Sequence, residues 1–263
     1  PRFGVMRGRE FLMKDNYSFD LSEQDAIISY NKMFEAYIKT FLRLGLVPIS
    51  LRAETGPIGG SLSHEFQILA KTGESELAYD PELVSQDLLK KSFDEITSMY
   101  SASDEMIDKS KSNVVLGRGI EVGHIFYFGT KYSEPLECYV LNNEGKKVTP
   151  YMGSYGIGVS RLTAAIIEAF HDDKGIKWPF NITPFKINII SSNDKFLDIA
   201  GELYDTLSKK YTNISFDDRD LSLGRKIKDS ELIGIPWSLI IGKNFDEKNE
   251  FEVINRSSGE KFF

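Results

Sequence analysis

Residues 153–170, with the sequence GSYGIGVSRLTAAIIEAF, constrain the fold of this chain more than any other stretch. Glycines at positions 153, 156 and 158 allow the backbone to approach a ligand closely. The residues after them switch to helical spacing. We therefore expect a strand or loop that feeds into a buried helix, whose apolar face consists of Leu162, Ala165, Ile166 and Ala169.

Arg161 falls in the first turn of this helix, where free backbone N–H groups and the positive end of the helix dipole favour an anion. This position predicts a clamp for phosphate. Two other interpretations fit the glycines. One is a buried helix entered through a tight glycine turn, with an incidental Arg161. The other is a dinucleotide fingerprint, which is disfavoured because Arg161 stands where the third glycine would be.

Length and composition limit the kind of protein that holds this clamp. A chain of 263 residues can form one large or two ordinary domains. No apolar run approaches the roughly 20 residues that cross a bilayer, so we expect a soluble, cytoplasmic protein. The net charge of −7 argues against broad electrostatic binding of nucleic acid, although a local basic groove remains compatible with it. The single cysteine, Cys138, excludes an internal disulfide and favours a reducing compartment.

The first 20 residues are rich in basic and aromatic side chains. Arg7, Arg9 and Phe11 alternate, which predicts one strand face with two guanidinium groups beside a ring. That combination suits a nucleotide, because guanidinium groups bind phosphate in a bidentate manner and a ring stacks on a base. An exposed edge strand with ordinary surface charge is the alternative.

Between residues 21 and 112 the pattern predicts a core helix, a strand and a compact insertion. Ser22 is expected to cap a helix that ends at Gly45, and residues 46–52 are typical of a strand. Residues 81–112 predict one or two helices, with an apolar stripe that consists of Leu89, Phe93, Ile96 and Tyr100.

Two histidines occur in predicted strands. His64 and Glu65 are adjacent and so point to opposite faces, which favours a structural, hydrogen-bonded His64 over a metal or acid–base site. His124 and Phe126 share one face of the strand after Val114, and on the residues alone His124 is expected in the core. A hairpin turn is predicted at residues 142–145.

After residues 178 and 179 the periodicity changes to alternating strands and helices. Strands at 185–191, 214–218 and 237–243, with helices at 194–211 and 223–233, predict a small α/β domain with a mostly parallel core. Charged residues lie where its strands lead into helices, which is the usual ligand side of such a sheet. Solvated loops are the alternative for these residues, which are Asp217, Asp218, Arg219, Arg225 and Lys226.

Five segments, in this order, resemble the bacterial type of prolyl-tRNA synthetase. They are PRFGVMRGREFLMKDNYSFD, ETGPIGGSLSHEFQ, RGIEVGHIFYFGTKYSE, GSYGIGVSR and DDRDLSLGRKIKDSELIGIPWSLIIG. The resemblance covers nearly the whole chain except residues 75–112. It implies an α+β fold, in which a class II synthetase antiparallel sheet with helices is followed by a small α/β anticodon-binding domain. The implied domains are a partial catalytic domain at 1–183 and an anticodon-binding domain at 184–263 that lacks its C-terminal end.

The resemblance also implies an ATP site. Arg7 and Phe11 would form the second half of motif 2, with Arg7 on the ATP γ-phosphate and Phe11 stacked on adenine. Arg161 would be the motif 3 arginine on the ATP phosphates. Glu121 and His124 would lie at ATP and its ribose, with Mg²⁺ at Glu121. The catalytic residues would be Arg7, Glu121 and Arg161.

By the same likeness, Phe126, Gly153 and Ser154 would contact the proline pocket, although the family often has Cys where Ser154 stands. The reaction implied is attack of the proline carboxylate on the ATP α-phosphate, which gives prolyl-adenylate, followed by transfer to a tRNA ribose hydroxyl. A homodimer is expected. The expected tRNA contacts are Arg2, Asp218, Arg219, Arg225 and Lys226.

Two departures from the family pattern carry expectations. Motif 1, the loop that binds the proline amine and the first arginine of motif 2 would all precede Pro1, so we expect a fragment that is inactive alone. The long editing insertion of many bacterial members is replaced by residues 75–112. A non-catalytic synthetase-like module is the main alternative, and the joint retention of Arg7, Phe11, Glu121 and Arg161 argues against it. A Rossmann-type cofactor enzyme is disfavoured by Arg161 and by the lack of an early βαβ unit.

Overall fold

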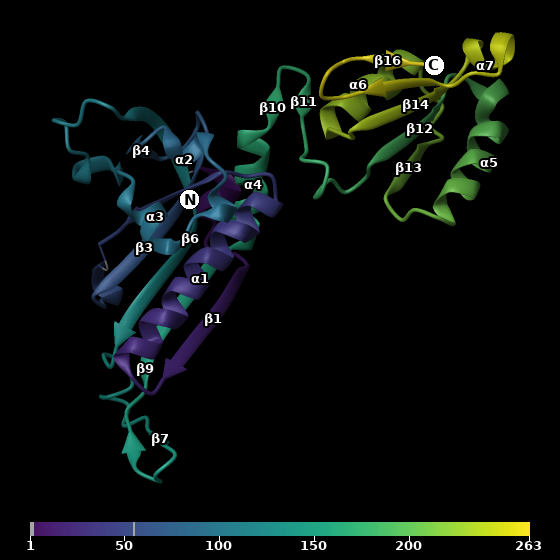
Figure 1. The fold of residues 1–263 in the computed structure, drawn as a ribbon. Helices are drawn as coiled ribbons and strands as arrows, with labels where there is room; N and C mark the ends of the chain where they lie inside the picture. Colours follow the sequence, from purple (N-terminus) through teal and green to yellow (C-terminus); the bar gives the residue numbers. More distant parts are fainter. Residues whose placement is uncertain (1–2, 55) are drawn as a thin grey trace. The chain divides into compact units, whose positions relative to one another are not determined.

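The computed structural model describes residues 3–54 and 56–263. It forms two compact units, Pro1–Ala169 and Phe170–Phe263 (Figure 1). The division comes earlier than the boundary predicted after residue 183. The reason is Arg256, which is buried in the second unit and donates hydrogen bonds to both carboxylate oxygens of Asp172. Within the described chain, no helix is long and apolar enough to cross a membrane.

The first unit is built on one antiparallel sheet. Its main path has the order β1, β9, β6, β3, β2, and β4 extends it by pairing with β6 and β5. A separate hairpin pairs β7 with β8, as predicted at residues 142–145. The strands are β1 (Met13–Asp20), β2 (Pro48–Arg52), β3 (Leu62–Leu69), β4 (Ser75–Tyr79), β5 (Ser101–Ser103), β6 (Val115–Gly129), β7 (Val140–Leu141), β8 (Lys147–Val148) and β9 (Tyr151–Gly158). The α-helices are α1 (Glu23–Arg43), α2 (Glu82–Ser85), α3 (Phe93–Ser98) and α4 (Val159–Ala169).

Helix α1 lies along one face of this sheet, across β1, β9 and β6 (Figure 1). Its predicted ends are confirmed: the Ser22 hydroxyl accepts a hydrogen bond from the Asp25 backbone N–H, and Gly45 adopts a φ of 82° just beyond the last turn. Large side chains fill the space between helix and sheet, where the Phe34 and Tyr37 rings of α1 pack at a tilt against the Phe66 ring of β3. The buried residues of α1 are Ala26, Tyr30, Phe34, Tyr37, Ile38 and Phe41.

The segment between β3 and β6 differs from the predicted helical stripe. The strands β4 and β5 join the sheet, and only short helices lie between them. Leu89 is 57% exposed, whereas Ile96 is buried. The reason is that Ser92 starts a new helix there, through a capping box with Glu95, so Leu89 and Ile96 do not share a helix. The buried apolar residues of the segment are Leu77, Ala78, Tyr79, Leu83, Leu88, Ile96 and Ala102.

The prediction of a strand through Arg7 and Phe11 is wrong. Residues Gly4–Arg7 form a short 3₁₀-helix, and the first strand begins only at Met13. Phe3 and Gly4 adopt φ values of 63° and 56°, which turn the backbone out of an extended course. The turn packs on α4, where the Arg161 Nε donates to the Met6 carbonyl at 2.9 Å.

The second unit confirms the predicted alternation of strands and helices. Its five-stranded sheet has the order β13, β12, β14, β15, β16, with β12 parallel to both neighbours. A two-stranded hairpin, β10–β11, precedes it. The strands are β10 (His171–Asp172), β11 (Gly175–Ile176), β12 (Ile187–Ser191), β13 (Ile214–Asp217), β14 (Trp237–Ile241), β15 (Glu252–Asn255) and β16 (Lys261–Phe262). The α-helices are α5 (Leu197–Ser208), α6 (Leu223–Ile233) and α7 (Lys243–Lys248).

Candidate active site

A β-bulge in β6 brings Glu121 and His124 to the same side of the sheet. The register against β3 shifts at this point: Phe66 pairs with Gly123, but Gln67 pairs with Glu121. Regular alternation would place residues 121 and 124 on opposite faces, and the extra residue at Val122 reverses this. The His124 Nδ1 lies 3.2 Å from the Glu121 Oε1. Both side chains lie on the face opposite α1.

Glu121 lies between two arginines. The Arg161 Nη1 is 3.5 Å from the Glu121 Oε2 and the Arg7 Nη2 is 3.9 Å from the same oxygen. Burial raises the pKa of Glu121, but the hydrogen bond with His124 and the positive charges around it outweigh this, and the net pKa is lowered. Burial and the nearby charge of Arg7 lower the pKa of Arg161. Two cations held this close favour an anion beside them.

The position of Arg161 follows from the chain order that the sequence predicted. Strand β9 ends at Gly158 and α4 begins at Val159, so no loop separates them. Arg161 then lies in the first turn of α4, and its Nη1 donates to the Glu121 carbonyl at 3.0 Å. The arginine is thereby fixed to both β6 and the segment that holds Arg7. The predicted juxtaposition of Arg7 and Arg161 is therefore present in the structure.

A second carboxylate lies beside this group. Glu65 pairs with His124 across β3 and β6, and their Oε1 and Nδ1 atoms are 4.0 Å apart. Side-chain ligand atoms of Glu65, Glu121 and His124 all lie within 4.8 Å of one another. The carboxylate oxygens suit Mg²⁺. The Nε2 of His124 is 2.5 Å from the Ser63 hydroxyl, so this ring is engaged on both sides.

Glu65 should make the fold less stable as the pH rises. Burial, and then the charge of Glu121, raise the pKa of Glu65. A raised folded-state pKa means that stability is fully present below the ordinary Glu pKa and is lost as the pH rises through the raised value. We expect Glu65→Gln to raise the melting temperature by a few degrees at pH 8 and to leave it unchanged at pH 4, measured by circular dichroism. The exposed Glu35→Gln on α1 is the control, and equal shifts for both variants would contradict the prediction.

The predicted proline-pocket residues do not all lie on this face. Phe126 pairs with Ser154 across β6 and β9, so both are on the side of His124, and the Phe126 and His124 rings stack at 3.9 Å. Gly153 differs, because a Cβ there would lie 2.1 Å from the Tyr155 Oη on the α1 side. The glycine is required by packing under α1, and its missing side chain points away from Phe126 and Ser154.

His64 lies on the α1 side of the sheet, and it makes a hydrogen bond there, as predicted for a structural histidine. It is buried, and its Nδ1 is 2.7 Å from the Tyr30 hydroxyl. Burial, with a further contribution from the charge of Arg52, lowers the pKa of His64 to about 4. The ring is therefore neutral and structural, and it is not part of the Glu65 cluster. Of the remaining predictions at this end of the chain, Phe11 is 52% exposed, and Arg2 lies outside the described residues.

The predicted tRNA contacts of the second unit separate into exposed and buried residues. Arg219 donates to both oxygens of Asp217 and also contacts Asp229, which pairs with Arg225 as well. Asp218 is exposed. The prediction for Lys226 is wrong, because this residue is 2% exposed and its Nζ donates to the Ser191 carbonyl at 3.1 Å. Helical spacing turns position 226 toward the sheet while 225 faces outward.

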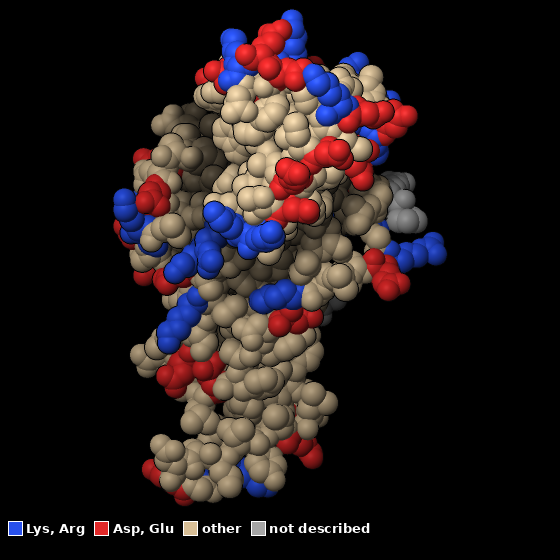
Figure 2. All heavy atoms as spheres, turned by 90° about the vertical axis from the view of Figure 1, so that its right-hand side faces the viewer, with Lys and Arg blue, Asp and Glu red and all other residues tan. Residues whose placement is uncertain are grey.

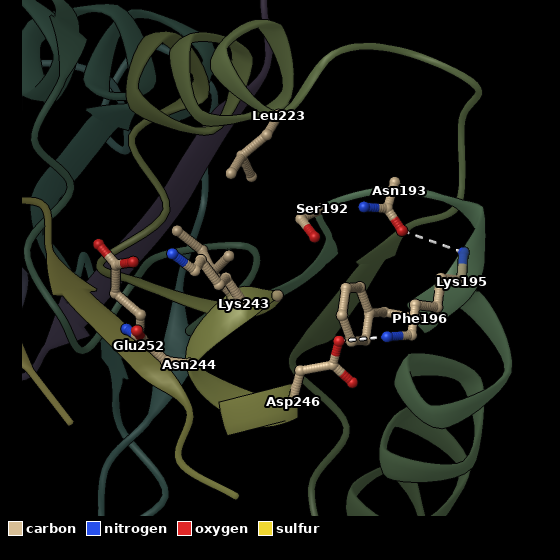
Figure 3. Close-up of a pocket in the computed structure, with 11 residues that line it drawn as sticks. Ser192, Asn193, Lys195, Phe196, Leu223, Lys243, Asn244, Asp246 and Glu252 are labelled. Atoms are coloured by element: carbon tan, nitrogen blue, oxygen red, sulfur yellow. Dashed lines mark hydrogen bonds and ion pairs between the residues drawn. The ribbon is translucent and has the colours of Figure 1, made fainter. Parts of the chain in front are cut away.

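Sequence reasoning missed a pocket of about 370 Å³ at the carboxyl end of β12 and β14. Figure 3 shows Leu223, from the start of α6, and Phe196 on its walls, with Asp246 facing the Lys195 ammonium, to which it is paired. Asn193 caps the turn below, since its Oδ1 accepts the Lys195 backbone N–H at 3.0 Å. In the sequence, the polar pair Ser192–Asn193 directly after a predicted strand could have indicated this pocket.

On the face drawn in Figure 2, Lys and Arg atoms are interspersed with Asp and Glu atoms. Charge of one sign does not dominate that face. We therefore infer binding sites from specific pockets and arginine pairs and not from net charge.

Both units match known families. Residues 2–170 match the family described as tRNA synthetase class II core domain (G, H, P, S and T). Residues 182–262 match the family described as anticodon binding domain. The two matches together span most of the chain, in the order that the fold shows.

Several relatives have one and the same function in their names. The proline–tRNA ligase of Wolbachia sp. subsp. Drosophila simulans (strain wRi) is 51% identical over 265 residues, which cover 99% of this chain and 62% of the relative. The proline–tRNA ligases of Ehrlichia canis and Rhizobium etli are each 49% identical, over 100% and 98% of this chain and 63% and 64% of the relative. The chain thus spans somewhat less than two thirds of these proteins.

Proposed function

This chain belongs to the family of class II tRNA synthetases with the core domain of the G, H, P, S and T enzymes, and we propose that it provides the ATP and tRNA sites of a proline–tRNA ligase. The observation that carries this is the convergence of Arg7, Glu121 and Arg161 on the open face of the sheet. Two guanidinium groups around one carboxylate suit a polyphosphate that is bound together with a divalent cation. The amino acid is inferred from the names of the relatives.

Each residue of this group has a separate task in the proposal. Arg161 and Arg7 bind the ATP phosphates and neutralise their charge as it redistributes in the transition state. Glu121, with Glu65 beside it, offers the oxygen ligands for Mg²⁺, which when bound supplies further positive charge at the phosphates. Phe11 is half exposed and offers a ring face to the adenine base. His124 is assigned to the ribose.

The proposed reaction requires little covalent chemistry from these side chains. The proline carboxylate attacks the ATP α-phosphate and pyrophosphate leaves, which gives prolyl-adenylate. A ribose hydroxyl of tRNA then attacks the prolyl carbonyl, and AMP leaves. Phe126 and Ser154 are adjacent on β6 and β9 and form the proposed wall for the proline ring. Because the Glu121 carboxylate is held by His124 on the same strand and Arg161 donates to the Glu121 carbonyl, the charges are pre-positioned and need not reorganise during the reaction.

The complete enzyme, by which we mean a protein of the relatives' length that contains this chain, is the proper subject of the assay. We propose that it is a cytoplasmic homodimer and that the 263-residue chain alone does not activate proline at a useful rate. The test is proline-dependent exchange of pyrophosphate into ATP, run on the complete enzyme with alanine and glycine as comparison substrates. Exchange with no preference for proline would contradict the proposed substrate.

The second unit is assigned to tRNA, and Arg219 and Arg225 are its proposed phosphate contacts. Both side chains are at least half exposed, although each is paired with an acid. We expect the double variant Arg219→Gln, Arg225→Gln to raise KM for tRNA several-fold and to flatten its salt dependence, with pyrophosphate exchange unchanged. The double variant Lys209→Gln, Lys248→Gln, at exposed positions after α5 and at the end of α7, is the charge-matched comparison. An unchanged KM would move the tRNA contact to another edge of this unit.

A further inference from the structure

A second pocket, of about 450 Å³, lies in the second unit at the edge where the parallel strands begin. Its floor includes the first residues of β12, β13 and β14, which are Ile187, Ile214 and Trp237. The pocket of Figure 3 lies at the carboxyl end of the same strands. The two sites are therefore at opposite edges of one sheet, and the function proposed above uses only the carboxyl edge.

Aromatic rings line this pocket and remain open to solvent. Phe180 is 51% exposed and Tyr211 is 59% exposed, and Trp237 at the start of β14 belongs to the floor. Exposed rings of this size are unfavourable in water unless something covers them. The volume is within the range of small-molecule sites and is mostly bounded by apolar groups.

Two lysines make the charge at the rim of this pocket positive only. Lys186 and Lys210 both line the pocket, and no acidic side chain of the described chain does. The Lys186 Nζ lies 4.7 Å from the centroid of the Phe180 ring. This arrangement differs from that of Arg219 and Arg225, where each cation is neutralised by a carboxylate. The pocket therefore combines apolar ring faces with uncompensated positive charge.

The walls are held in place before any ligand arrives. The Asn213 side chain donates to the Pro184 carbonyl at 3.2 Å, and the Lys186 backbone N–H donates to the Asn213 carbonyl at 2.7 Å. A turn from Pro179 to Ile182 fixes the segment that carries Phe180. Pre-formed walls reduce the entropy that binding would otherwise lose.

We propose that this pocket binds a single unstacked nucleotide, with its base against Phe180, Tyr211 and Trp237 and its phosphate at Lys186 and Lys210. Base stacking on aromatic rings, together with cations that follow the phosphate, is the general means by which proteins hold single-stranded nucleic acid. The base can belong to an RNA strand or to a free nucleotide, since both present the same chemistry. The proposal does not depend on proline activation, because every residue in it lies in the second unit.

Trp237 provides a direct probe. In a Trp178→Phe background it is the single tryptophan of the chain, and nucleoside monophosphates and tRNA should each be titrated while its emission is followed. We expect saturable quenching, weakened about tenfold or more by Tyr211→Ala. The double variant Lys186→Gln, Lys210→Gln should weaken binding several-fold and reduce its salt dependence. Lys209→Gln, the exposed neighbour outside the pocket, should change neither.

The two sources of the nucleotide give different results. Quenching by tRNA but not by monophosphates identifies an RNA strand, and quenching by monophosphates with tRNA affinity unchanged in the lysine variant identifies a free nucleotide.

Calorimetry of the unsubstituted chain covers the case in which Trp178→Phe fails to fold. Absence of both heat and quenching, with monophosphates at millimolar concentration and with tRNA, would overturn the proposal. A binding constant that Tyr211→Ala leaves unchanged would overturn it as well. Pyrophosphate exchange is expected to be unaffected, so failure here is separable from failure of the ligase proposal.

Discussion

Arg161→Ala in the complete enzyme is expected to lower the rate of proline-dependent pyrophosphate exchange by about 10²–10³-fold. This is the range for losing one pre-positioned donor to a developing charge, roughly 3–4 kcal/mol of barrier. The Arg161 side chain is 21% exposed and its Nη1 lies 3.5 Å from the Glu121 carboxylate, so solvent cannot replace it well. The measurement is the exchange rate at saturating ATP and proline, followed with labelled pyrophosphate.

The controls for Arg161 separate charge, shape and folding. Arg161→Lys keeps the charge but loses the planar fork, and it should recover only part of the rate. Arg43→Ala removes an exposed arginine at the end of α1 and should leave exchange unchanged. Circular dichroism melting of each variant shows whether a loss of rate follows a loss of fold. If Arg161→Ala exchanged within threefold of the parent at an unchanged melting temperature, the phosphate role would have to be abandoned.

Lys226→Ala is expected to destabilise the second unit by about 3 kcal/mol. The variant leaves buried acceptors without a donor and creates a cavity beneath α6. The Lys226 Nζ donates to the Ser191 carbonyl, to the Ser191 hydroxyl and to the Asp217 carbonyl at 3.1–3.3 Å. Both tryptophans of the chain, at positions 178 and 237, lie in this unit, so their emission during urea unfolding reports on it alone.

Lys228→Ala is the matched comparison, because it removes an exposed lysine from the same helix. Its free energy of unfolding should lie within about 0.5 kcal/mol of that of the parent. A tRNA role for position 226 would be restored if Lys226→Ala had the same free energy of unfolding as Lys228→Ala but bound tRNA less tightly.

The elements that sequence reasoning predicted well are those with long periodic patterns or strong end signals. Helix α1 begins after Ser22 and ends before Gly45 as the capping residues indicated. The strands and helices of the second unit follow the predicted alternation, because buried parallel strands leave continuous apolar runs. The approach of Arg161 to Arg7 depended on a helix that starts directly after a strand, which the glycine pattern also showed.

The features that were missed depend on contacts distant in sequence. No local signal distinguishes the bulge at Val122, which sets the side of Glu121, from regular alternation. The 3₁₀ turn at Gly4–Arg7 is held by Arg161, far along the chain, whose Nε donates to the Met6 carbonyl. Lys226 and Arg225 differ by one position and are equally basic, and only the packing of α6 on the sheet separates them.

The direct passage from β9 into α4 has a consequence for which length changes this protein tolerates. A single inserted or deleted residue between positions 151 and 158 would exchange the two faces of β9, so that Tyr155 would leave its place under α1. The same change would rotate the start of α4 by about 100°, one residue of a helical turn, and so move the guanidinium of Arg161 off Glu121. The β7–β8 hairpin, only a few residues upstream, has an exposed tip and no such constraint. Natural length variation is therefore expected to collect in the hairpin and to be excluded from the strand that follows it.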